Sequence, residues 1–373
     1  MKRNVKTTLI IALLTFSILP LTAQTLTVAP NGGNRKAAVS EIIGITKVSI
    51  NYDRPGVKGR EGKVWGGLVP YGYNDLGFGT SKAAPWRAGA NENTTFEFST
   101  DVKIEGKDLA PGKYAFFIAL TEGGDATLIF SKNATSWGSF FYKPEEDALR
   151  VVVKTEKATE SVEWLTYSFV NQTDNGATVA LTWEKLKIPF KIEVDLVKTQ
   201  VASFRKELRN DVGFQWQSWV QAANFCVTNN TNLEEALTWA EYGVAGVFVG
   251  QKNFQTLACK ASVLDKLGRK AEADAVMKDA APLGSMNEIH NYARTLLRDK
   301  RTKEAFEIFK LNADKNPNTF TTNMGMMRAY SAIGDYKKAV EFAQKSLPQA
   351  PDPGNKAHVE TCIKKLQEGK DVN

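Results

Sequence analysis

Two polar segments in the first half of the chain carry the side chains best suited to hold a ligand. They run from Asn51 to Arg60 and from Trp86 to Thr95. Arginine presents a planar fork of donors to a carboxylate, a phosphate or sugar oxygens, and tryptophan or tyrosine presents a face for stacking. The sequence therefore predicts a site for a polar organic ligand. The candidate residues are Arg54, Arg60, Tyr71, Trp86, Arg87, Asn91, Glu92 and Trp137.

The same residues could instead serve structure alone. An ion pair between Arg87 and Glu92, a turn capped by Asn91 and a sheet end closed by Trp86 would use them without any ligand. A further aromatic and cationic group could line the same site from another edge, although core packing is the simpler prediction for its tryptophan. This group comprises Lys132, Trp137, Gly138 and Tyr142.

Sequence motifs for catalysis are absent. Both histidines, His290 and His358, and all three cysteines lie in the second half, which excludes Ser-His-Asp and Cys-His catalysis in the first half. The chain contains no G-x-x-x-x-G-K-[ST] phosphate loop and no H-E-x-x-H element. We therefore predict no cofactor, no metal site and no catalytic residue.

Two other functions stay open beside a binding protein. A hydrolase of cell-envelope or carbohydrate substrates would use a carboxylate together with an arginine. A carbohydrate-binding module would use an aromatic stacking platform. The candidates for the hydrolase are Glu92, Asp53 and Asp75 with Arg87 or Arg60, and those for the module are Trp86, Tyr71 and Trp137.

Short runs of β-branched and aromatic residues between about Val39 and Val194 indicate the elements that carry these residues. Turn sequences such as Thr173-Asp174-Asn175-Gly176 separate the runs. About eight short strands without a long helix predict an antiparallel β-sandwich or barrel-like domain. The candidate strands are Thr46–Tyr52, Thr94–Ser99, Lys113–Leu120, Ala126–Phe130, Leu149–Lys154, Val162–Val170, Ala177–Trp183 and Phe190–Val194.

Helical periodicity replaces this pattern after Leu196, and residues 197–212 are predicted to form a connecting helix. Beyond it, Ala305 and Ala339 are 34 residues apart, which is the period of the tetratricopeptide repeat. Pro317 and Pro351 keep the same spacing. Weaker units around Ala236 and Ala273 bring the expected number of helical hairpins to about four. They form a tetratricopeptide-like solenoid, closed by a helix over Lys356–Gln367.

The three cysteines, Cys226, Cys259 and Cys362, all fall in this helical half. We predict that they are small buried residues on helix faces rather than disulfide or redox partners.

The first 23 residues have the features of a secretory signal peptide. A basic start precedes an apolar run from about Leu9 to Leu19, and small residues lie before Gln24. No cysteine stands near the expected cleavage point, where it could carry a lipid, and no later segment is apolar enough to span a bilayer. The formal net charge is +7, and three of these positive charges lie in residues 1–23. The remaining charge is small, so we predict no nucleic-acid partner. We expect an exported protein, periplasmic, at the cell surface or secreted, and not a lipoprotein.

The first half also resembles the domain of unknown function DUF2911, which is common in exported proteins of Bacteroidetes. The resemblance implies export and a β-rich fold, and it implies no reaction or catalytic residue. Residues Tyr73 to Pro85 form a longer insert than in the form associated with the family. The matching stretches are Ile43-Gly44, Asn51 to Arg60, Leu68 to Gly72, Trp86 to Thr95, Leu109 to Ala115 and Trp137-Gly138.

The expected organisation is thus a signal peptide over residues 1–23, an all-β domain over 24–196 and helical repeats over 197–373. The leading hypothesis is an exported binding and interaction protein. Its β domain would hold a polar or carbohydrate ligand, and its helical repeats would dock a partner protein.

Overall fold

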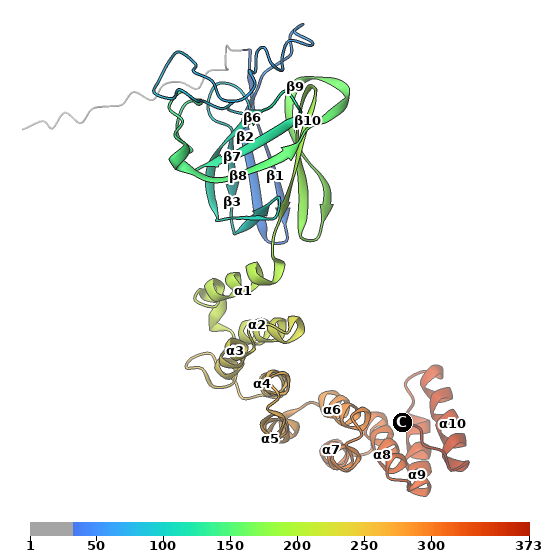
Figure 1. The fold of residues 1–373 in the computed structure, drawn as a ribbon. Coiled ribbons are helices and arrows are strands. Elements are labelled where there is room, and N and C mark those ends of the chain that lie inside the picture. Colours follow the sequence, from blue (N-terminus) through green and yellow to red (C-terminus); the bar gives the residue numbers. More distant parts are fainter. Residues whose placement is uncertain (1–32) are drawn as a thin grey trace, which may run out of the picture.

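A computed structural model of the chain describes residues 33–373, which form a β domain followed by a row of helices (Figure 1). The predicted signal peptide lies outside the described residues. None of the described helices combines the length and the hydropathy needed to cross a membrane.

The β domain consists of two antiparallel sheets whose inner faces share one core. The strand order of each sheet is open-ended within the described residues, so the domain is a sandwich rather than a closed barrel. The first sheet contains, in spatial order, β1 (Arg35–Ile43), β2 (Thr46–Arg54), β3 (Thr95–Phe98), β6 (Gly112–Leu120), β7 (Asp125–Ser131) and β8 (Asp147–Lys154). The second contains β5 (Lys107–Leu109), β4 (Val102–Ile104), β10 (Gly176–Glu193) and β9 (Glu156–Thr173).

Alternation along the strands decides which side chains reach the core. In β2, Val48 and Ile50 are fully buried between the sheets, whereas Lys47 and Asn51 point outward and are exposed. Aromatic rings join the two sheets; the rings of Phe96 and Phe190, for example, lie 5.8 Å apart.

The long strands β9 and β10 differ from the shorter pieces predicted. The predicted strands Ala177–Trp183 and Phe190–Val194 fall in one strand, β10, which ends at Glu193, because bulges between Thr182 and Leu186 bend it without ending it. No candidate strand corresponded to β1, although its second half lies within the predicted β region. The sequence pattern also missed β4 and β5. Each has only three residues, too few to show an alternation.

Four helical hairpins and a closing helix follow, as predicted (Figure 1). The connecting helix α1 (Leu196–Glu207) ends earlier than predicted, and a 3₁₀ turn over Asp211–Phe214 follows it. The hairpins pair α2 (Trp216–Asn229) with α3 (Leu233–Ala245), α4 (Phe254–Lys266) with α5 (Lys270–Ala280), α6 (Met286–Arg298) with α7 (Thr302–Lys315), and α8 (Phe320–Ala332) with α9 (Tyr336–Ser346). The closing helix α10 spans Pro353–Gln367.

The repeated alanines occupy one structural position. Ala236, Ala273, Ala305 and Ala339 are each the fourth residue of the second helix of a hairpin, and each is buried. A small side chain there lets the two helices approach closely. Gly334 occupies the turn of the last hairpin with φ of 81°, a conformation that favours glycine. All three cysteines are free and buried, as predicted.

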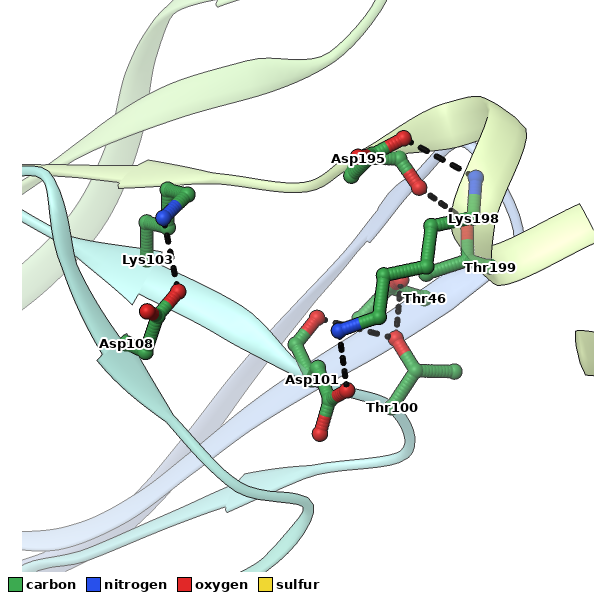
Figure 2. A network of polar contacts seen from close by, with 8 residues as sticks. All are labelled: Thr46, Thr100, Asp101, Lys103, Asp108, Asp195, Lys198 and Thr199. Atoms are coloured by element: carbon green, nitrogen blue, oxygen red, sulfur yellow. Dashed lines mark hydrogen bonds and ion pairs between the residues drawn. The ribbon is translucent and has the colours of Figure 1, made fainter. Parts of the chain in front are cut away.

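The start of α1 joins the β domain to the helices (Figure 2). Asp195 caps α1 by accepting a hydrogen bond from the Lys198 backbone N–H at 2.9 Å, and Lys198 Nζ lies 3.0 Å from Asp101 Oδ2 in the sandwich. Farther along α1, Val201 belongs to the helical core. The helix therefore contacts both parts of the protein.

Candidate polar cleft

A cleft of about 370 Å³ lies beside the outer face of the first sheet. Strands β1 and β2 contribute one wall. The loop over residues 86–95 and the segment over residues 134–137 contribute the others. The lining side chains that matter chemically are Lys36, Asp53, Glu92, Asn93, Lys113 and Trp137.

Asp53 is buried although it lies on the outward side of its strand. The alternation that buries Val48 and Ile50 turns Asp53 away from the core, yet its residue is only 4% exposed. The 86–95 loop passes over it. A Cβ at Gly89 would approach Asp53 O to 3.1 Å and Thr94 Oγ1 to 2.6 Å, so glycine permits this close approach.

Several hydrogen bonds hold the 86–95 loop in an irregular conformation. Ala88 and Asn91 both have positive φ, 49° and 54°, which is uncommon for residues other than glycine. Arg87 Nη1 donates to Asn91 O at 2.7 Å, and the buried Tyr167 hydroxyl donates to Ala88 O at 2.8 Å. Such strained backbone is often found at functional sites.

One ammonium group serves two carboxylates at the mouth of the cleft. Lys36 Nζ lies 2.8 Å from Glu92 Oε2 and 3.5 Å from Asp53 Oδ2. The hydrogen bond from Lys36 lowers the pKa of Glu92 to about 2. Burial, and then the neighbouring Glu92, raises the pKa of Asp53. The two carboxyl groups therefore differ in acidity.

Polar atoms in the cleft wall are left without partners. Asp53 Oδ1 and both polar atoms of the Asn93 side chain are buried, and none has a hydrogen-bond partner among the described residues. Asn93 is 8% exposed. An unpaired buried polar group costs about 1–3 kcal/mol, so such groups are rare unless a ligand or water uses them.

Trp137 is 56% exposed at the edge of the cleft, so it does not pack in the core as the simpler interpretation expected. Its ring stacks on Phe140 with centroids 5.8 Å apart. The Arg87 guanidinium lies 5.2 Å from the centroid of the Trp137 ring, and burial lowers the pKa of Arg87. The ion pair between Arg87 and Glu92 does not form, because Glu92 binds Lys36.

The remaining sequence candidates lie outside the cleft lining. Arg54 donates to Leu165 O and Thr166 Oγ1, and Arg60 donates to Val57 O and Gly56 O. These hydrogen bonds use the guanidinium groups to hold strands and loops in place.

Two aromatic candidates also lie elsewhere. Trp86 packs against Trp65 and Trp183 at the edge of the sandwich core. Tyr71 is 39% exposed, and its ring lies against Gly66. Asn91 is adjacent to the cleft, where its Oδ1 accepts a hydrogen bond from Asn34. Glu92 and Trp137 are thus the two ligand-binding candidates in the lining, and Asp53, a candidate for the hydrolase, lies there too.

Sequence reasoning did not select Lys36, Asn93 or Lys113. The predicted strand pattern began at about Val39, so Lys36 fell outside it, whereas β1 begins at Arg35. Asn93 stood within the polar segment 86–95, but nothing in its local sequence marked it as buried. The candidate strands began only at Thr46, and it is the separate strand β1, paired with β2, that places Lys36 opposite Asp53.

The two parts of the chain are similar to different known proteins. Residues 34–192 match the family described as "Protein of unknown function (DUF2911)". No curated protein matches the sequence.

Solved structures similar to part of the chain are tetratricopeptide-repeat proteins. YrrB, described as having an unusual peptide-binding site, is 19% identical, with 44% of this chain and 84% of that chain covered and a TM-score of 0.31. A repeat protein from Parabacteroides merdae is 15% identical, with 47% of this chain and 68% of that chain covered and a TM-score of 0.32. A thermophilic repeat protein from Thermus thermophilus is 14% identical, with 45% of this chain and 91% of that chain covered and a TM-score of 0.30. The DUF2911 match over residues 34–192 thus coincides with the β-sandwich of this chain, and tetratricopeptide-like helical hairpins follow it.

Proposed function

We propose that this protein is an exported binding protein whose cleft holds a neutral, polyhydroxylated ligand such as a sugar. The observation that carries the proposal is the pair of buried residues Asp53 and Asn93, whose polar atoms lack partners in the cleft wall. Hydroxyl groups both donate and accept hydrogen bonds. They would satisfy the carboxylate oxygen and both atoms of the amide.

The charges around the cleft favour a neutral ligand over an ionic one. Two lysines, Lys36 and Lys113, and two carboxyl groups, Asp53 and Glu92, line the cleft, so its formal charges balance, and Lys36 is already engaged by both carboxyl groups. Burial opposes the ionised form of Asp53, which argues against a site built for a cation. Trp137 offers an exposed ring against which the apolar face of a sugar could stack.

A thermal-shift screen of the full chain against neutral sugars, amino sugars and sugar acids tests this proposal. A neutral sugar is expected to raise the melting temperature by mass action. Asn93→Ala and Trp137→Ala should each abolish the shift. Their matched controls outside the cleft lining, Asn175→Ala and Phe141→Ala, should preserve it. A screen without any hit, or a hit that persists in Asn93→Ala, would overturn the proposal.

A hydrolase is the second candidate, and a specific observation favours it. Two carboxyl groups that share Lys36 have pKa values displaced in opposite directions, which is the arrangement needed for an acid and a base. Release of nitrophenol from nitrophenyl glycosides or esters by the full chain would support catalysis. Turnover that survives Asp53→Asn combined with Glu92→Gln would exclude these residues as its source.

Export is the second element of the proposal, and the composition of residues 1–23 supports it. We propose that the mature protein begins at Gln24 and works in the periplasm or at the cell surface. N-terminal sequencing of protein recovered from the envelope fraction tests this. An intact Met1 on protein in the cytoplasmic fraction would contradict it.

Docking of a partner protein by the helical hairpins is the third element. Stacked hairpins of this kind present an extended surface that no single hairpin could provide. Crosslinking of the full chain in envelope extract, followed by mapping of crosslinks to residues 197–373, tests this element. Crosslinks confined to the β domain would contradict it.

A further inference from the structure

A second cavity, of about 510 Å³, lies in the helical part between α6 and α8. Both helices are the first of their hairpins. The polar residues around the cavity are Asn291, Arg294, Thr295, Arg298, Arg328 and Asn373.

The cavity is positively charged and its lining contains no acidic side chain. Arg294, Arg298 and Arg328 form no ion pair with any described residue. Three other arginines of the helical part do have carboxylate partners: Arg205 pairs with Glu235, Arg269 with Glu272, and Arg301 with Asp274 and Glu304.

Like charges lie close together here despite partial burial. Burial lowers the pKa of Arg328, and the neighbouring Arg294 lowers it further. Burial and the same two arginines lower the pKa of His290 to about 4, so this histidine stays neutral near pH 7. Asp371 acts on Arg328 in the opposite direction, yet three guanidinium groups around one cavity still leave an excess of positive charge, which an anion would relieve.

A short segment of the chain already lies along α8 at the edge of the cavity. Ser331 Oγ donates to Asp371 Oδ1 at 2.6 Å and accepts from the Val372 backbone N–H at 3.1 Å. Arg328 O accepts from Asn373 Nδ2 at 3.0 Å, and Arg328 Nη1 lies 3.5 Å from Val372 O. This surface therefore binds both peptide backbone and an acidic side chain.

We infer that the cavity between α6 and α8 docks an acidic, extended segment of a partner protein. The inference rests on the docking role proposed for the helical part, and it names the chemistry of the partner. Backbone groups of the segment would bind beside residues 371–373, to the Asn291 side chain of α6. Its carboxylates would accept hydrogen bonds from Arg294, Arg298 and Arg328, since arginine forks match carboxylate geometry.

Fluorescence anisotropy with a labelled Gly-Asp-Gly-Asp-Gly-Asp peptide, measured on the full chain, tests the inference. We expect it to bind at least about tenfold more tightly than a Gly-Asn-Gly-Asn-Gly-Asn peptide, since hydrogen bonds to charged groups are the stronger ones. Arg294→Gln and Arg298→Gln should each weaken binding about tenfold. Both residues are exposed, so these variants should fold. Arg269→Gln, just before α5 and outside the cavity lining, is the matched control and should bind like the parent.

Equal binding of the two peptides, or unchanged binding by both cavity variants, would overturn the inference. Single-stranded DNA of equal charge that competes as well as the acidic peptide would also overturn it, in favour of a general polyanion site. The crosslinking experiment shows whether only the inference about the cavity is wrong or whether the helical part docks no partner at all. If the double variant Arg294→Gln/Arg298→Gln crosslinks to a partner as well as the parent does, the helical part still docks a partner. The cavity would then not be the docking site.

Discussion

Lys36 lies directly opposite Asp53 in the β1–β2 ladder, with its Nζ 3.5 Å from Asp53 Oδ2. The same ammonium is closer to Glu92, so it is shared between two carboxylates. The other oxygen of Asp53 is left unpaired inside the cleft wall. This arrangement makes Asp53 the residue with the clearest consequences for stability and for binding.

Asp53→Asn should not lower the melting temperature at pH 7. Burial raises the pKa of Asp53 in the folded state, so ionisation of this carboxyl group opposes folding. The stability linked to its neutral form is fully present below the unfolded pKa, near 3.9, and is lost as the pH rises through the folded pKa. The advantage of the Asn variant should therefore shrink between pH 7 and about pH 4. Thermal unfolding at both pH values checks this, and a clearly lower melting temperature at pH 7 would contradict it.

Lys36→Met should raise the pKa of Glu92 from about 2 toward the ordinary value near 4.3, because it removes the hydrogen bond that lowers it. In the parent protein, the stability linked to Glu92 is present above about pH 4.3 and is lost as the pH falls toward 2. The variant should lose less stability over this range. Carbon-detected NMR titration of the Glu92 carboxyl group measures the shift. Lys82→Met, which removes the partner of Asp75, is the control and should leave Glu92 unchanged.

Trp137→Ala should abolish ligand binding with little loss of stability, since more than half of its surface is exposed. Trp86→Ala should instead cost about 3 kcal/mol, because the Trp86 ring packs against Trp65 and Trp183. Urea unfolding of both variants makes the comparison. Equal destabilisation by the two substitutions would show that Trp137 supports the fold.

Ala273→Leu should destabilise the helical part by about 1–3 kcal/mol, because its side chain is buried where the helices of a hairpin approach closely. Ala271→Leu is the matched control, two residues earlier on the same helix and exposed. It should change stability by less than about 0.5 kcal/mol. Urea unfolding followed by circular dichroism at the helical signal tests the pair. Two equal losses would refute the assignment of Ala273 to the packing position.

Asp195→Ala should destabilise the protein by about 1 kcal/mol, because it removes the side chain that caps α1 (Figure 2). Lys198→Met should cost less, because its ion pair with Asp101 is largely exposed on both sides. Thermal unfolding in low and high salt distinguishes them. A large, salt-sensitive loss for Lys198→Met would mean that the ion pair, rather than the cap, holds the junction.

Much of the fold could be predicted because its signals are local. The alternation of Val48 and Ile50 with Lys47 and Asn51 is visible in the sequence, and β2 follows it. The 34-residue spacing of Ala305 and Ala339 likewise marks a packing position. Very short strands and bulged strands were harder to predict. Three residues are too few to show an alternation, and a bulge interrupts the alternation of a longer strand.

The sequence by itself determined the order of the parts, the antiparallel β domain and the four hairpins with their buried alanines and cysteines. The structure decided that the β domain is a sandwich rather than a barrel. Only the tertiary structure decided which polar residues share a cleft. Asp53 lies on the outward side of β2, and no local pattern distinguishes it from the exposed Asn51. Its burial depends on the 86–95 loop, which comes much later in the chain. Strand register places Lys36 opposite it, and the close approach at Gly89 brings that loop over it. The residues that contact Asp53 are therefore set by strand register and by the position of the loop. Both depend on packing between segments far apart in the chain, and the local sequence does not encode that packing.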